Sequence, residues 1–242
     1  MAFKLSYKAY GAHAILIEWP KQISESILDD LLKFKATLET SELRNIQDIR
    51  SAYQTLLIVY NTPIIFKKET EYLKHLYTSV NSHQTITTNI WSIPVCYNDM
   101  FGLDLQVISD SKSISKTEII KRHSEPTYTV YGIGFLPGFL YLGGLDPILE
   151  MPRQSTPRPR IEKGSVAIGG QQTGIYPSDS PGGWNILGKT PLSFFNPTLE
   201  KPCFAQPGDR IQFYSISLQE FETITALVEA DSYDIKRRSY HD

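Results

Sequence analysis

A proline-rich segment carries the arginines best suited to bind an anion. Residues 151–160 read Met-Pro-Arg-Gln-Ser-Thr-Pro-Arg-Pro-Arg, so three arginines alternate with three prolines. Proline restricts the backbone, so less conformational entropy is lost when a neighbouring side chain is held in one direction. Guanidinium pairs bidentately with carboxylate or phosphate. We therefore predict that Arg153 and Arg158 are catalytic residues that stabilise anionic groups. A solvated turn at the rim of the fold is the alternative, and local sequence favours neither.

A second polar group lies in a loop bounded by glycines. Gln172 and Tyr176 bring an amide and a phenol into the run Gln171-Gln-Thr-Gly-Ile-Tyr-Pro177. Such groups orient a polar ligand through hydrogen bonds. We predict that Gln172 and Tyr176 are catalytic residues that orient the substrate. The same groups could instead satisfy the backbone of a buried loop, and local chemistry alone slightly favours that alternative.

Aromatic residues lie in two turns, Gly134-Phe-Leu-Pro-Gly-Phe-Leu-Tyr-Leu-Gly-Gly144 and Ser180-Pro-Gly-Gly-Trp-Asn185. Aromatic residues on rigid turns make good anchors for a ligand or a partner, although core packing is the commoner fate of a tryptophan. A lone histidine at the end of a predicted helix is more often structural than catalytic. The residues predicted to bind substrate or partner are Phe135, Pro137, Phe139, Tyr141, Trp184, Asn185 and His123.

The elements that position these residues fall into two domains. Between Gly132 and Pro191 lie 12 of the 15 glycines and 8 of the 15 prolines, so every strand expected there is short, as in an all-β barrel. The first ninety residues instead alternate strand, helix, strand, helix, strand, which indicates a small α+β layer. We predict an α+β N-terminal domain (1–88), a β-barrel domain (89–230) and a frayed, solvated tail (231–242).

The individual elements follow from periodicity and caps. The expected strands are 14–19, 52–60, 85–95 and 127–135, followed by short strands up to 213. The expected helices are 27–38 after Ser24, 68–79, 104–108, 115–123 and 221–230, with capping boxes at Ser115 to Glu118 and Ser217 to Glu220.

Composition narrows the classes of function. The formal net charge is −2 in 242 residues, which gives no general attraction to nucleic acid or to an anionic membrane. There is no apolar run of membrane-spanning length and no signal-peptide pattern. Two cysteines cannot build a disulfide framework, so we expect a cytoplasmic protein. Two cysteines and five scattered histidines form no ligand spacing, so we predict no metal site.

Standard nucleotide motifs are missing from the sequence. There is no G-x-x-x-x-G-K-[ST] run, and Gly132-Ile-Gly-Phe-Leu-Pro-Gly138 departs from G-x-G-x-x-G by one residue. Use of ATP is therefore not indicated by a phosphate-binding loop of this chain.

Together, the loops resemble those of the B subunit of bacterial ATP-dependent 5-oxoprolinase, a family also described as the sporulation-kinase inhibitor KipI and as allophanate hydrolase subunit 1. The resemblance runs in family order across the second domain. The matching runs are 93–97, 131–146, 152–153, 157–158, 164–166, 172–177, 180–184 and 188–191. Where the family usually has Gly-Arg-Thr, this chain has Gly188-Lys-Thr190.

The resemblance implies a cyclophilin-like barrel as the C-terminal domain and a function that needs companions. It implies a complex with two further 5-oxoprolinase subunits, named C and A in the family, of which the C subunit makes direct contact. That complex opens 5-oxo-L-proline to L-glutamate at the expense of ATP, with magnesium as the expected metal. Two alternatives stay open: a binding module that inhibits a histidine kinase, and a subunit related to carboxyltransferase and allophanate hydrolase.

Overall fold

The computed structural model describes residues 3–41, 45–80 and 85–240. The chain divides into two compact units, one reaching to Thr87 and the other comprising Thr88–Tyr240. Each unit is built around its own hydrophobic core.

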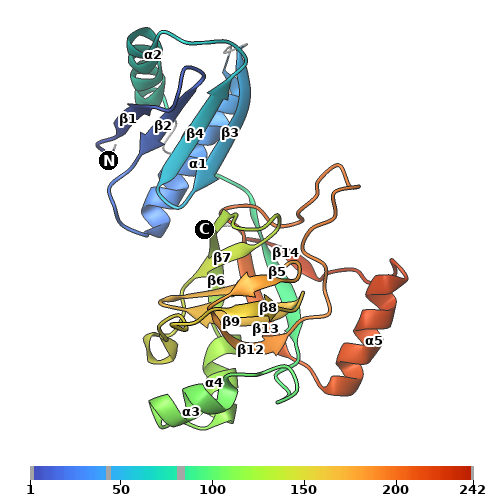
Figure 1. Cartoon of the computed structure of the whole chain (residues 1–242). Helices are drawn as coiled ribbons and strands as arrows, with labels where there is room; N and C mark the ends of the chain where they lie inside the picture. Colours follow the sequence, from blue (N-terminus) through green and yellow to red (C-terminus); the bar gives the residue numbers. More distant parts are fainter. Residues whose placement is uncertain (1–2, 42–44, 81–84, 241–242) are drawn as a thin grey trace. The chain divides into compact units, whose positions relative to one another are not determined.

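The N-terminal unit is an antiparallel sheet covered by two helices (Figure 1). The strands follow the order β1-β2-β4-β3. Its elements are β1 (Ser6–Ala9), β2 (Ala14–Glu18), α1 (Glu25–Thr40), β3 (Ile46–Ala52), β4 (Thr55–Tyr60) and α2 (Phe66–Thr78). Alternate residues of β4 are buried, as expected for a strand with one covered face. In the core, the Phe34 ring of α1 meets the Tyr77 ring of α2 at 5.0 Å.

Both helices predicted for this unit are present, and the predicted strands 14–19 and 52–60 correspond to β2 and β4. Two further strands, β1 and β3, were not predicted. Most of β1 is exposed, so it lacks the apolar alternation from which a strand is recognised. The run Ile46–Ala52 carries Asp48 and Arg50 and forms a strand because it pairs with β4.

The C-terminal unit is a strongly curved sheet in the order β14-β5-β13-β6-β7-β10-β9-β12, with β11 and β8 as a separate pair. All pairs are antiparallel except β5 with β13. The strands are β5 (Thr88–Val95), β6 (Thr127–Ile133), β7 (Leu140–Gly143), β8 (Arg158–Ile161), β9 (Ser165–Gly169), β10 (Gln172–Ile175), β11 (Ser180–Gly182), β12 (Asn185–Lys189), β13 (Arg210–Ser215) and β14 (Arg237–Tyr240).

This sheet does not close through a continuous ladder within the described residues. The end of β5 meets β12 only at an isolated bridge between Cys96 and Lys189. The prediction of a mixed fold made of helices and a large, mainly antiparallel sheet is confirmed, but a closed barrel is not observed.

The C-terminal unit also contains three helices, α3 (Leu105–Lys112), α4 (Lys116–Ser124) and α5 (Leu218–Glu229), and one short 3-10 turn at Pro147–Leu149. The sequence predicted all three helices, and Figure 1 shows α3 beside α4. The Ser115 hydroxyl accepts a hydrogen bond from the Glu118 amide at 3.1 Å. Ser217 and Glu220 form the complete reciprocal capping box. None of the helices in the described ranges is long and apolar enough to cross a membrane.

The prediction of a frayed tail is wrong for residues 237–240. These residues form β14, which pairs antiparallel with β5, and the Arg237 guanidinium lies 5.7 Å from the Trp91 ring centroid. A basic cluster at a chain end is usually solvated, but here the edge of β5 provides backbone partners. The last two residues, 241–242, lie outside the described residues.

Candidate functional site

Most of the residues predicted to bind substrate come together around one cavity of the C-terminal unit. The cavity holds about 330 Å³, near the lower end of the range for small-molecule sites. We call it the aromatic pocket. It is lined by Phe135, Phe139, Tyr141, Tyr176 and Trp184, together with Arg153, Gln154, Pro157, Pro181, Gly182 and Gly183.

The aromatic walls are held by packing between rings. Phe139 is 2% exposed and meets both Tyr176 and Trp184 edge-on, at centroid distances of 5.3 and 5.5 Å. Tyr141 packs on Phe139 at 4.9 Å. Edge-to-face pairs of this kind stabilise a fixed arrangement beyond simple burial. The pocket therefore has a rigid apolar floor.

Two glycines allow the rings to approach the backbone. A Cβ atom on Gly169 would lie 2.7 Å from the Trp184 indole, and one on Gly182 would overlap the Tyr176 hydroxyl. Both contacts are closer than a side chain tolerates, so the Gly-rich composition of this region reflects close approach as well as turn geometry.

Phe135 lies at the mouth of the pocket in an unusual conformation. Its φ is +67°, in the left-handed region, and its side chain is 61% exposed. The ring contacts Phe139 edge-on at 5.6 Å. A bulky residue rarely adopts this backbone conformation, because its Cβ crowds the following carbonyl oxygen.

Arg153 is the cation of the pocket. Its guanidinium lies 5.7 Å from the Trp184 ring centroid, a cation–π distance. Within residues 3–41, 45–80 and 85–240, no carboxylate lies within ion-pair distance of Arg153. Burial raises the pKa of the Tyr141 phenol, and the positive charge of Arg153 opposes that rise. Arg153 is thus available to pair with an anionic ligand.

Arg158 has a carboxylate partner. Its guanidinium donates to both oxygens of Asp104, at 2.7 and 2.9 Å, and the Asp104 side chain is almost completely buried. This bidentate pair fixes Arg158 beside a second cavity, so Arg158 and Arg153 have different surroundings. Asp104 itself was predicted only as the start of a helix.

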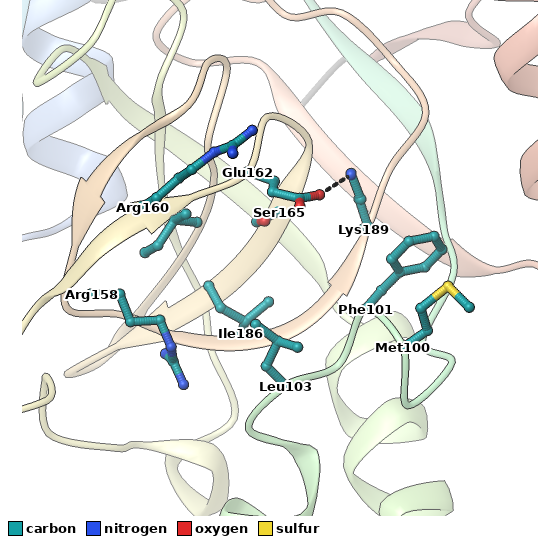
Figure 2. Close-up of a pocket in the computed structure, with 10 residues that line it drawn as sticks. Met100, Phe101, Leu103, Arg158, Arg160, Glu162, Ser165, Ile186 and Lys189 are labelled. Carbon is teal, nitrogen blue, oxygen red and sulfur yellow. Dashed lines mark hydrogen bonds and ion pairs between the residues drawn. The ribbon is translucent and has the colours of Figure 1, made fainter.

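The second cavity, which we call the Lys189 pocket, holds about 350 Å³ (Figure 2). Figure 2 shows Arg158 and Arg160 pointing apart and the Lys189 ammonium reaching Glu162, an ion pair of 2.6 Å. Arg160 pairs with Asp179 at 2.7 Å. Each cation of this pocket already has a carboxylate partner. The lining is Met100, Phe101, Leu103, Arg158, Arg160, Ile161, Glu162, Ser165, Ile186 and Lys189.

His123 lies in the core and outside both pockets. It is fully buried, its ring stacks on Phe213 at 4.8 Å, and burial lowers its pKa to about 3. The Thr173 hydroxyl donates to the Ala167 carbonyl, so it must accept from the His123 Nε2–H at 2.8 Å. Nδ1 then accepts from the Tyr97 hydroxyl at 2.7 Å. The imidazole is therefore a neutral, fully hydrogen-bonded structural group.

The remaining predicted residues surround the aromatic pocket without lining it. Asn185 is buried, and its amide donates to the Pro152 carbonyl at 3.0 Å, which holds the segment that presents Arg153. Gln172 lies on β10 opposite Gly169, and Pro137 is exposed on the turn before β7. In the described part of the chain, no three His, Cys, Asp or Glu side chains are grouped so as to hold a metal ion.

Comparison with known proteins places this geometry in a family. The family model described as carboxyltransferase domain, subdomain C and D, matches residues 5–205. The 5-oxoprolinase B subunit of Bacillus subtilis is 32% identical over 232 residues, covering 91% of this chain and 97% of the relative. The 5-oxoprolinase B subunit of Haemophilus influenzae is 48% identical over 121 residues, covering 50% of this chain and 57% of the relative.

A solved structure supports the fold. The urea amidolyase of K. lactis superposes with a TM-score of 0.83 at 19% identity, covering 100% of this chain and 16% of that chain. At this identity the likeness concerns the fold alone. The chain has a carboxyltransferase-type C and D fold with an aromatic pocket. It belongs to the family of the 5-oxoprolinase B subunit.

Proposed function

We propose that this chain is one subunit of an ATP-dependent 5-oxoprolinase complex, which opens the lactam ring of 5-oxo-L-proline to give L-glutamate. The names of its relatives support the proposal. The observation that carries it is the aromatic pocket with Arg153 at its edge and no carboxylate partner for that cation among the described residues.

The pocket suits the chemistry of this substrate. 5-Oxoproline is a compact ring bearing one carboxylate and one lactam amide. We assign Arg153 to the carboxylate, because guanidinium pairs with carboxylate through two parallel hydrogen bonds. The two faces of the 5-oxoproline ring pack on the Trp184 and Tyr141 side chains. The Tyr176 phenol, whose ordinary pKa already keeps it protonated near neutral pH and whose pKa burial raises further, serves as a donor that orients the lactam.

Arg158 and Gln172 take indirect roles in this proposal. Arg158 is engaged by Asp104, and Gln172 lies outside the pocket lining. We assign Arg158 to holding the 151–160 segment and Gln172 to the strand that supports the pocket floor.

We further propose that the chain acts only in a complex with the C and A subunits of 5-oxoprolinase, with the C subunit in direct contact. The exposed Phe135 at the mouth of the pocket supports this, because aromatic residues are enriched at protein interfaces. The bridge between Cys96 and Lys189 supports equating the curved sheet with a cyclophilin-like barrel.

Both cysteines are free, which fits a cytoplasmic location.

ATP and its magnesium are proposed for the complex, and we assign no residue of this chain to either. The glycine turn that ends at Gly138 leads into strand β7 and not into a helix N-terminus, so it lacks the dipole and amides of a phosphate cradle. We therefore assign activation of the inert lactam by phosphoryl transfer to the companion subunits.

The test is reconstitution from purified subunits. The chain mixed with the C and A subunits should release glutamate and ADP from 5-oxoproline, and none of the three should release either product by itself. Failure of the three-component mixture to consume 5-oxoproline, with the complex intact by gel filtration, would remove the proposal.

Inhibition of a histidine kinase is a second candidate, favoured by the same exposed Phe135. Under it, the isolated chain slows kinase autophosphorylation without companions. A pull-down with the tagged chain separates the two candidates, since one retains a kinase and the other retains the C subunit.

A further inference from the structure

Asp104 has an unusual position for a helix-capping residue. It occupies the N-cap of α3, but its side chain makes no cap hydrogen bond to that helix. An N-cap aspartate ordinarily satisfies the first amides of its own helix. Here the carboxylate turns away, and the residue is only 3% exposed. Its hydrogen-bonding capacity is used elsewhere.

The carboxylate accepts four hydrogen bonds from distant parts of the chain. Oδ1 accepts from Gln154 Nε2 at 3.2 Å and from Arg158 Nη2 at 2.7 Å. Oδ2 accepts from Arg158 Nη1 at 2.9 Å and from the Ile186 amide at 2.6 Å. The Asp104 amide donates in turn to the Ile186 carbonyl at 3.0 Å.

These partners lie in the two chain segments that contribute walls to the aromatic pocket, although Arg158 and Ile186 themselves line the Lys189 pocket. Gln154 lines the pocket next to Arg153, and Arg158 lies in the same proline-rich segment. Ile186 lies two residues after Trp184, the ring that faces Arg153. One buried carboxylate therefore connects the wall that carries the cation to the wall that carries the indole.

We propose that Asp104 is a positioning residue that sets the spacing between Arg153 and Trp184 and thereby the affinity of the aromatic pocket for its small carboxylate ligand. The identity of that ligand rests on the proposed function. The positioning itself rests only on the hydrogen bonds of Asp104.

Replacement of Asp104 by Asn should separate the two walls without unfolding the chain. The amide keeps the size of the carboxylate but turns an NH2 group toward donors on Gln154 or Arg158. The Arg158 side chain is 27% exposed, so its freed guanidinium can turn to water. Asp146→Asn is the matched control, because Asp146 also pairs with an arginine (Arg122, 2.8 Å) and accepts from a backbone amide (Ile148, 2.9 Å) away from the pocket.

The first readout does not depend on the substrate. The chain has three tryptophans, so labelling with 5-fluorotryptophan gives three 19F resonances, and Trp184→Phe assigns the one of interest. Asp104→Asn should shift or broaden the Trp184 resonance and leave those of Trp19 and Trp91 in place. Asp146→Asn should leave all three in place. An unmoved Trp184 resonance in Asp104→Asn would overturn the proposal.

The second readout uses the reconstituted complex. Asp104→Asn should raise KM for 5-oxoproline by roughly 10-fold, the loss expected when a charge-assisted hydrogen bond to the ligand is weakened, with a smaller change in kcat. Asp146→Asn should leave KM unchanged. A shifted Trp184 resonance in a complex that does not consume 5-oxoproline would retain the positioning role and reject the proposed substrate. An unchanged KM in an active complex would overturn the link between Asp104 and affinity.

Discussion

The guanidinium of Arg153 lies 5.7 Å from the centroid of the Trp184 indole, although the two residues come from different loops of the chain. Arg158, in the same proline-rich segment as Arg153, is bound by Asp104. Although the two arginines share a local sequence environment, Arg153 can bind an anion, whereas Arg158 holds the proline-rich segment. The proposed function depends on this difference.

Phe135→Gly should separate stability from function. Glycine adopts φ +67° without the cost of roughly 1–2 kcal/mol that a side chain incurs there, and the exposed ring contributes little burial. We expect the free energy of unfolding of the isolated chain to stay the same or rise, while kcat/KM of the complex falls by at least about tenfold, a change of ~1.4 kcal/mol.

Tyr53→Gly is the control, because Tyr53 also has a positive φ, +53°, and lies outside the C-terminal unit. The kcat/KM of a complex that contains the Tyr53→Gly variant should match that of the wild-type complex. Full activity of Phe135→Gly would show that the exposed ring has no functional part.

His123 should make stability depend on pH in the acid range. Its pKa is about 3 in the folded chain and about 6.5 when unfolded, so between these values the unfolded state binds a proton that the folded state does not. The free energy of unfolding contributed by this group is therefore retained above pH 6.5 and falls, by up to about 1.4 kcal/mol per pH unit, as pH drops toward 3.

Urea denaturation at pH 6.5 and pH 4.5 measures this dependence. His123→Gln, which keeps hydrogen-bonding groups but does not titrate, should show a smaller loss of stability between the two pH values than the wild type. Equal losses in both proteins would contradict the assignment of a neutral buried imidazole.

Gly169→Ala should displace the indole of Trp184. The added Cβ would lie 2.7 Å from ring atoms that are themselves packed on Phe139, so the ring must move. Overpacking of this kind costs roughly 1–3 kcal/mol. Thermal unfolding and near-UV circular dichroism should both change. At Gly134 an added Cβ meets nothing within 4 Å, so Gly134→Ala should change neither, and identical behaviour of the two variants would count against the rigid aromatic floor.

The placement of aromatic residues on glycine- and proline-rich turns was predictable from the sequence because its signal is local. Glycine and proline mark the turns, and the aromatic residues lie within those turns at Phe135, Phe139 and Trp184. Helix ends were predictable for the same reason, as the capping box at Ser217 and Glu220 shows.

The features that the sequence did not predict depend on contacts between residues that are far apart along the chain. The partners of Asp104 lie 50, 54 and 82 residues away, and no local pattern distinguishes an aspartate that caps its helix from one that turns away. Strand β14 forms only because β5 offers a free edge to a charged segment. Arg158 therefore looked as available as Arg153, although only the structure supplies its carboxylate partner.

The central claim is that Arg153 in the aromatic pocket binds the carboxylate of 5-oxoproline, and kinetics of the reconstituted complex test it most directly. Arg153→Gln should raise KM for 5-oxoproline by roughly 10-fold or more, since charged hydrogen bonds contribute about 1.5–3 kcal/mol. Arg160→Gln, which alters an arginine of the same segment that pairs with Asp179, should leave KM unchanged. Equal KM values in Arg153→Gln, Arg160→Gln and wild-type complexes would contradict the claim.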